Sequence, residues 1–168
     1  MRTDTKSKEH DSNEAARRYV LLVDGNGGGG PLKAAWRQLG LNDDLRIVAD
    51  PEKAVRLLRE AETGSAAAPV AALVLDPETT SEGTGDFLRR VRTTLSGNPV
   101  PIVFWSRDHS KYRALEGGEV VSVVPKPMVL RVIQALDGAC GLRKRPFAPF
   151  AGGTLARRRA RGNNGATA

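Results

Sequence analysis

Four polar residues stand at the ends of short apolar runs and together could handle a phosphoryl group. They are Asp24, Asp76, Ser106 and Lys126. A carboxylate can attack phosphorus and form an acyl phosphate, and a second carboxylate can help to hold Mg²⁺, which prefers oxygen ligands. A lysine ammonium offers positive charge to the phosphoryl oxygens, and a serine hydroxyl can donate a hydrogen bond to them. These residue types indicate phosphoryl chemistry, provided that the fold brings them together.

The elements that must position these residues alternate regularly along the chain. Apolar runs predict five strands, at 19–24, 45–49, 71–75, 100–105 and 120–124. A helical spacing of apolar residues follows each run, as at Leu32, Trp36 and Leu39. Near-continuous apolar strands that alternate with helices are typical of a parallel sheet covered on both faces. We therefore expect an α/β fold with a doubly wound five-stranded parallel sheet in the flavodoxin-like order 2-1-3-4-5.

This strand order gives the four residues a common location. The first and third strands are neighbours, so Asp24 and Asp76 should meet at the carboxyl edge of the sheet. The ends of the fourth and fifth strands deliver Ser106 and Lys126 to the same edge. The sequence thus predicts one crevice that contains two carboxylates, a hydroxyl and an ammonium.

Charge divides the chain into three segments. Residues 1–18 are polar and aperiodic and predict a disordered arm, residues 19–142 predict one folded domain, and residues 143–168 predict a basic disordered tail. The formal net charge is +7, and the last segment alone holds seven basic and no acidic side chains. The folded part is thus near neutral, and contact with nucleic acid is expected only through the arginine-rich tail, 157–161.

Composition excludes several classes of protein. No run reaches the roughly 18 consecutive apolar residues of a membrane-spanning helix, and the N-terminus lacks the apolar core of a secretory signal. One cysteine, Cys140, excludes an internal disulfide framework, and two histidines make a zinc site improbable. We expect a cytoplasmic protein with no membrane association.

Four segments resemble the signature blocks of response-regulator receiver domains of two-component systems. They are LLVDGN (21–26), ALVLDP (72–77), PIVFWS (101–106) and VVPKPM (123–128), and the resemblance covers about residues 19–140. It implies phosphorelay signal transduction rather than an enzyme, with a histidine kinase or small phosphodonor upstream and a protein partner downstream. It also implies that Lys126–Pro127 is a candidate for a cis peptide bond.

The same resemblance implies a role for each residue at the strand ends. Asp76 would be the phosphoacceptor, Asp24 a metal ligand, Ser106 the switch hydroxyl and Lys126 the phosphate-binding lysine. The metal ligands would be Asp24 and Asp76. A further acidic ligand that the family usually has is absent from this sequence, and Glu78 is the first candidate to take its place.

Departures from the family pattern indicate an atypical, stand-alone receiver. Gly25 stands where receivers place a second acid that ligates the metal, so Mg²⁺ binding should be weak or absent. The segment 77–83 differs from the usual loop after the phosphoacceptor, and Val123 replaces the usual aromatic residue. These departures favour an alternative, a pseudoreceiver that binds proteins independently of phosphorylation.

Two further features allow more than one interpretation. The pattern Gly25-x-Gly27-x-x-Gly30 after a strand is typical of dinucleotide-binding loops, but here it arises from a run of glycines. Trp105 and Tyr112 lie near the region that receivers commonly use to contact partners, and they could be exposed there or buried in the core.

Overall fold

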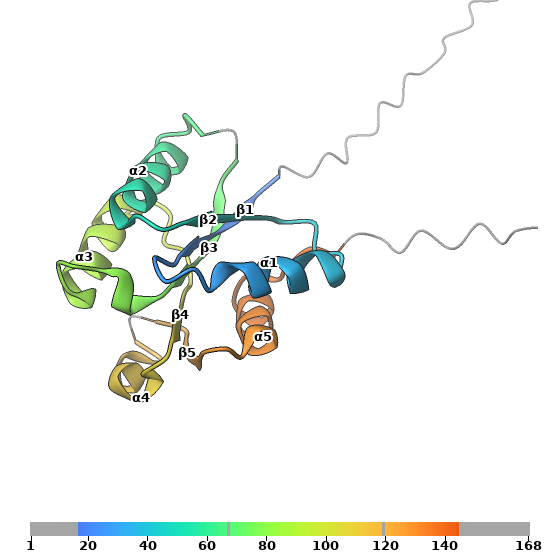
Figure 1. The fold of residues 1–168 in the computed structure, drawn as a ribbon. Coiled ribbons are helices and arrows are strands. Elements are labelled where there is room, and N and C mark those ends of the chain that lie inside the picture. Colours follow the sequence, from blue (N-terminus) through green and yellow to red (C-terminus); the bar gives the residue numbers. More distant parts are fainter. Residues whose placement is uncertain (1–16, 67, 119, 145–168) are drawn as a thin grey trace, which may run out of the picture.

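The computed structural model describes residues 17–66, 68–118 and 120–144. Five parallel strands form one sheet in the order β2-β1-β3-β4-β5, which confirms the predicted fold class and topology (Figure 1). The strands are β1 (Tyr19–Val23), β2 (Asp44–Val48), β3 (Val70–Leu75), β4 (Ile102–Ser106) and β5 (Ser122–Pro125). Their ends agree with the predicted runs to within two residues.

Helices cover both faces of the sheet. The helices are α1 (Gly29–Gln38), α2 (Pro51–Glu62), α3 (Thr84–Thr94), α4 (His109–Tyr112) and α5 (Val129–Cys140), with 3-10 turns at Pro77–Thr79 and Arg113–Leu115. Figure 1 shows α2 and α3 on one face and α1 and α5 on the other. No helix in the described part of the chain is long and apolar enough to cross a membrane.

Alternating strand residues build two apolar layers. Leu21 and Leu73 pack toward α2 and α3, whereas Val20 and Val74 pack toward α1 and α5. Full burial on both faces explains why the strands read as continuous apolar runs. Trp105 and Tyr112 are 1% and 6% exposed, so both belong to the core and neither forms an exposed anchor.

Local sequence signals start two of the helices. Asp50 caps α2 by accepting a hydrogen bond from the Glu52 N–H at 2.9 Å, and Pro51 occupies the first helical position. Helix α1 begins at Gly29, two residues before the proline that indicated its first turn, with Gly28 as an N-cap that makes no side-chain hydrogen bond.

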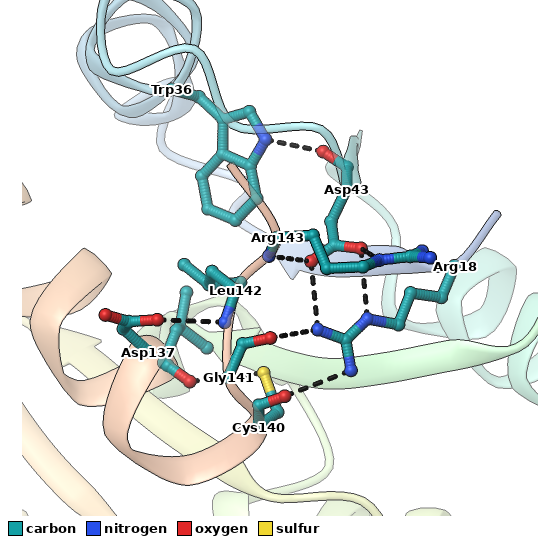
Figure 2. A network of polar contacts seen from close by, with 9 residues as sticks. Arg18, Trp36, Asp43, Asp137, Cys140, Gly141, Leu142 and Arg143 are labelled. Atoms are coloured by element: carbon teal, nitrogen blue, oxygen red, sulfur yellow. Dashed lines mark hydrogen bonds and ion pairs between the residues drawn. The ribbon is translucent and has the colours of Figure 1, made fainter. Parts of the chain in front are cut away.

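The two ends of the folded part meet at Asp43, on the edge of the sheet opposite to the strand carboxyl ends (Figure 2). The buried Asp43 carboxylate accepts hydrogen bonds from Nε of Arg18 at 3.0 Å and Nε of Arg143 at 2.8 Å. The Arg18 guanidinium also donates to the backbone carbonyls of Cys140 and Gly141. Arg18, Asp43 and Arg143 are called the terminal clasp below.

The terminal clasp corrects the expected limits of the folded domain. The sequence placed Arg18 in the N-terminal arm and Arg143 in the C-terminal tail, because charged residues beside polar segments resemble solvated chain. Both side chains instead neutralise a buried carboxylate. The backbone of Lys144 also forms an isolated antiparallel β-bridge with the backbone of Leu41. The rest of both predicted terminal segments, including the arginines of 157–161, lies outside the described residues.

Candidate functional site

The carboxyl edge of the sheet brings three of the predicted residues into direct contact. Lys126 Nζ lies 2.8 Å from Asp76 Oδ2 and 3.1 Å from Asp24 Oδ1. Both carboxylates are fully buried, and the lysine side chain is 9% exposed. The ammonium therefore bridges two carboxylates that lie 52 positions apart in the sequence.

Backbone hydrogen bonds between neighbouring strands fix the positions of these residues. The Asp76 N–H donates to the carbonyl of Val23, and the Asp24 N–H donates to that of Val48, each at 2.9 Å. The Lys126 N–H donates to the carbonyl of Ser106 at 2.9 Å. The backbone of each of these three residues thus continues the hydrogen bonding between neighbouring parallel strands. Because β1 and β3 are adjacent, the distance between the two carboxylates is set by the sheet.

Asn26 also belongs to this site, and the sequence analysis missed it. Its Nδ2 donates to Asp76 Oδ2 at 2.7 Å, and its backbone N–H donates to Asp24 Oδ1 at 3.1 Å. An asparagine two residues after a strand resembles an ordinary turn residue, so residue type and spacing gave no signal of this contact.

The surroundings of Asp76 keep its carboxyl group ionised. Burial raises the pKa of Asp76, but hydrogen bonds from Lys126 and Asn26 lower it more, and the net pKa lies below the usual carboxyl value. Its second oxygen, Oδ1, accepts a hydrogen bond from the Glu78 N–H at 3.1 Å. The result is a buried, oriented carboxylate, which is the ionic form that a nucleophile requires.

Ser106 reaches the site indirectly, through Glu78. The Ser106 hydroxyl donates to Oε1 of Glu78 at 2.5 Å, and the same oxygen accepts a hydrogen bond from the Asp108 N–H at 3.4 Å. Ser106 is fully buried, whereas Glu78 is exposed. The structure therefore places Ser106 beside the site, with its hydroxyl engaged by Glu78.

Only part of the predicted metal set comes together. Asp24 Oδ2 is buried and has no hydrogen-bond partner, which fits a cation ligand beside Asp76. Glu78, the expected third ligand, instead directs its carboxylate to Ser106. Among the described residues, no group of three or more histidine, cysteine, aspartate or glutamate side chains is arranged to hold a metal. Lys126 supplies positive charge to both carboxylates.

Gly25 is enclosed more tightly than the sequence suggested. A Cβ atom at this position would lie 2.8 Å from Cγ2 of Thr79 and 3.3 Å from the carbonyl oxygen of Ala49. The Gly25 N–H donates to Oγ1 of Thr79 at 3.0 Å. Thr79 therefore occupies the space that a side chain at position 25 would need.

The end of β5 completes the site. The Lys126–Pro127 peptide bond is cis, as the family resemblance implied. Lys126 Nζ also lies 5.1 Å from the centre of the Trp105 ring. Val123 is buried, and Phe104 and Tyr112 pack edge to face in the core with ring centres 5.5 Å apart.

Comparisons with known proteins place the chain among receiver domains by fold. No protein-family model matches the sequence, and no match was found among curated proteins. The receiver domain of the sensor histidine kinase PA1611 from Pseudomonas aeruginosa, with magnesium in its active-site cleft, has a TM-score of 0.58 at 22% identity. The alignment covers 76% of this chain and 99% of that domain.

Two further structures support the same fold. The receiver domain of the histidine kinase CKI1 from Arabidopsis thaliana, complexed with Mg²⁺ and BeF₃⁻, has a TM-score of 0.55 at 17% identity, over 73% of this chain and 90% of that one. The phosphorylated cyanobacterial phytochrome response regulator RcpA has a TM-score of 0.56 at 17% identity, over 74% of this chain and 91% of that one. The described part of the chain therefore has the receiver-domain fold.

Proposed function

We propose that this chain is an atypical receiver in a cytoplasmic phosphorelay, a signalling domain rather than an enzyme, which accepts a phosphoryl group on Asp76. The observation that carries the proposal is the contact of Lys126 Nζ with both Asp76 and Asp24 at the carboxyl edge of the sheet. The donor would be a histidine kinase or a small phosphodonor, and the signal would pass to a downstream protein by contact. The receiver fold supports this assignment.

In the proposed reaction, an oxygen of Asp76 attacks phosphorus in line with the leaving group. A phosphorus–oxygen bond forms as the bond to the donor nitrogen or oxygen breaks, and the donor keeps the bonding electron pair. Lys126 would move from Asp76 to the transferred oxygens as the carboxylate charge becomes an acyl phosphate. Mg²⁺, if held by Asp24 and Asp76, would neutralise negative charge on the phosphoryl group.

Intact-mass spectrometry tests this proposal directly. The full chain is incubated with acetyl phosphate and Mg²⁺, and we expect one phosphoryl adduct that hydroxylamine removes, as it removes acyl phosphates. Asp76→Asn should abolish the adduct, whereas Asp50→Asn, at the N-cap of α2, should retain it. An adduct that persists in Asp76→Asn would contradict the assignment.

A pseudoreceiver is the second candidate, and contacts within the site favour it specifically. Asn26 already donates a hydrogen bond to Asp76 Oδ2 without a phosphoryl group, and Glu78 engages the Ser106 hydroxyl. Such a site could serve as a fixed structural element below a protein-binding surface. This candidate predicts no adduct in the wild-type chain with either acetyl phosphate or a phosphorylated histidine kinase.

A further inference from the structure

An apolar groove of about 220 Å³ lies on the side of the molecule formed by α1 and α5 (Figure 1). Three segments line it, and the residues that matter here are Leu39 and Leu41 after α1, Leu130, Ile133 and Asp137 on α5, and Lys144 after α5. The volume lies below the range of about 300–1,000 Å³ that is usual for small-molecule sites. The groove therefore suits a few amino-acid side chains better than a separate ligand.

The rim of this groove exposes apolar side chains to solvent. Leu39 is 45% exposed, and Leu130, at 60%, is the most exposed large apolar side chain of the described residues. Leu41 and Ile133, which line the same groove, are 6% and 7% exposed and belong to the core between the sheet and these helices. Exposed apolar side chains that continue directly from a buried core mark a surface that another segment covers.

The described part of the chain ends at this groove. The backbone of Lys144, the last described residue, pairs antiparallel with that of Leu41, and the Asn42 N–H donates to the carbonyl of Arg143 at 2.6 Å. In an antiparallel pair, the residue that follows on one strand lies opposite the residue that precedes on the other. The direction of the chain at Lys144 therefore leads from Leu41 toward Leu39, which is along the groove.

The six residues that come next, RPFAPF (145–150), include two large apolar side chains. The chain has four phenylalanines. Phe87 and Phe104 are fully buried in the layer that faces α2 and α3. The other two, Phe147 and Phe150, come shortly after the last described residue. An apolar surface that lacks cover and an apolar segment are thus adjacent along the chain.

The spacing of the two phenylalanines matches the length of the groove. Pro146 and Pro149 favour the polyproline II conformation, in which residues three positions apart lie on the same side of the chain at a distance of about 9 Å. Leu130 and Asp137, which both line the groove, are about 10 Å apart along the axis of α5. Two aromatic rings at this spacing can cover both ends of the groove.

We propose that residues 146–150 of this chain dock in the groove between α1 and α5, with the two phenylalanine rings over Leu39 and Leu130. Because only residue 145 separates this segment from the described structure, its effective concentration at the groove is about millimolar, which favours it over a separate protein. The docked segment would keep this face of α5 from binding another chain. The proposal goes beyond the phosphorelay role and does not depend on phosphorylation of Asp76.

Nuclear Overhauser effects in the full chain test the proposal. The protein is deuterated except for the phenylalanine rings and ¹³C-labelled leucine methyl groups, and Leu39→Met and Leu130→Met assign the two leucines. Phe87 and Phe104 are buried on the opposite face of the sheet, so a contact between a phenylalanine ring and either leucine must come from residue 147 or 150. We expect such contacts to both leucines in the wild-type chain.

Substitutions in the C-terminal segment show whether the contacts are specific. Phe147→Ala/Phe150→Ala should remove the contacts to both leucines and change their methyl chemical shifts, because the ring currents are lost. The control is Leu155→Ala, which removes the other large apolar side chain after Lys144 and should leave contacts and shifts unchanged. All three variants lie outside the core, so the folded domain is retained in each.

The absence of any contact between a phenylalanine ring and Leu39 or Leu130 in the wild-type chain would overturn the proposal. A mixture in which one copy has the labelled leucines and another has the protonated rings reports contacts between copies. If the contacts arise only there, the groove is an interface between two copies of this chain and the proposal is wrong. It is also wrong if Leu155→Ala removes the contacts as completely as the double variant does.

Discussion

The Ser106 hydroxyl donates a short hydrogen bond of 2.5 Å to Oε1 of Glu78, so the residue predicted to act as the switch hydroxyl already has a partner within the chain. Glu78 follows Asp76 by two positions, and its own N–H donates to Asp76 Oδ1. The segment that follows Asp76 thus contacts both Asp76 and Ser106. A hydrogen bond to a charged acceptor is stronger than a neutral one, so its release has a measurable cost.

Removing the Glu78 side chain should prolong the life of a phosphoryl group on Asp76. In Glu78→Ala, the freed Ser106 hydroxyl can donate to the phosphoryl oxygens, and we expect the adduct to decay about tenfold more slowly. The decay is measured by mass spectrometry after removal of acetyl phosphate. Glu82→Ala removes a similar charge from the same loop, where Glu82 pairs with Arg90, and should leave the decay unchanged. If the adduct also decays more slowly in the double variant Glu78→Ala/Ser106→Ala, the Ser106 hydroxyl is not the group that stabilises it.

Replacing Lys126 with methionine should destabilise the fold near neutral pH. The variant leaves Asp24 and Asp76 buried without their shared cation, and the free energy of unfolding should fall by about 3 kcal/mol. Because the pKa of Asp76 is lowered in the folded state, its stabilising contribution is present above the usual carboxyl pKa and is lost as pH falls through the folded value. The difference in free energy of unfolding between wild type and Lys126→Met should therefore become smaller below about pH 4.

Urea unfolding at pH 7 and at pH 3.5 measures this difference. Lys53→Met, at an exposed position of α2, controls for the loss of a surface lysine and should change stability little at either pH. If the free energy of unfolding of Lys126→Met lies below that of wild type by an amount that stays constant or grows on acidification, the ionised carboxylates are not the source of the lost stability.

The sequence was sufficient for the strand order and for the shared edge of Asp24, Asp76 and Lys126, because buried parallel strands leave a continuous apolar pattern and end in polar residues. It was insufficient for contacts that depend on the direction of a side chain. Asn26 turns toward Asp76, and Glu78 turns away from the carboxylates toward Ser106. Either orientation is compatible with the same residue type in a loop, so tertiary packing decides it.

Restoring an acid at position 25 should strengthen Mg²⁺ binding only if Thr79 is also reduced in size. Gly25 does not have a positive φ, so the obstacle to Gly25→Asp is the contact of its Cβ with Cγ2 of Thr79 at 2.8 Å. Thr79→Ser removes that methyl group and keeps the hydroxyl that accepts from the Gly25 N–H. We expect the double variant to bind Mg²⁺ at least tenfold more tightly than wild type in calorimetry, because it adds a charged oxygen ligand.

The single variants are the controls for this prediction. Thr79→Ser alone should bind Mg²⁺ as weakly as wild type, and Gly25→Asp alone should lose thermal stability because of the steric contact. Tight Mg²⁺ binding by the wild-type chain, unchanged in the double variant, would mean that Gly25 does not limit the affinity.

The terminal clasp should make a larger contribution to stability than its place at the ends of the fold suggests. Burial raises the pKa of Asp43, but hydrogen bonds from Arg18 and Arg143 outweigh burial and lower it overall. In Asp43→Asn, two cations face a neutral amide, and we expect the free energy of unfolding at pH 7 to fall by about 3 kcal/mol. Asp44→Asn changes the adjacent, exposed carboxylate and should have little effect.

The pH dependence of the Asp43 variant distinguishes an ionic clasp from a merely packed one. A lowered folded-state pKa stabilises the protein above the usual carboxyl pKa, and this stabilisation is lost as pH falls through the folded value. The difference in free energy of unfolding between wild type and Asp43→Asn, measured with urea, should therefore be largest near pH 7 and become smaller below about pH 4. If this difference is independent of pH, the loss comes from packing and hydrogen bonding around Trp36 and the neighbouring backbone rather than from the charge of Asp43.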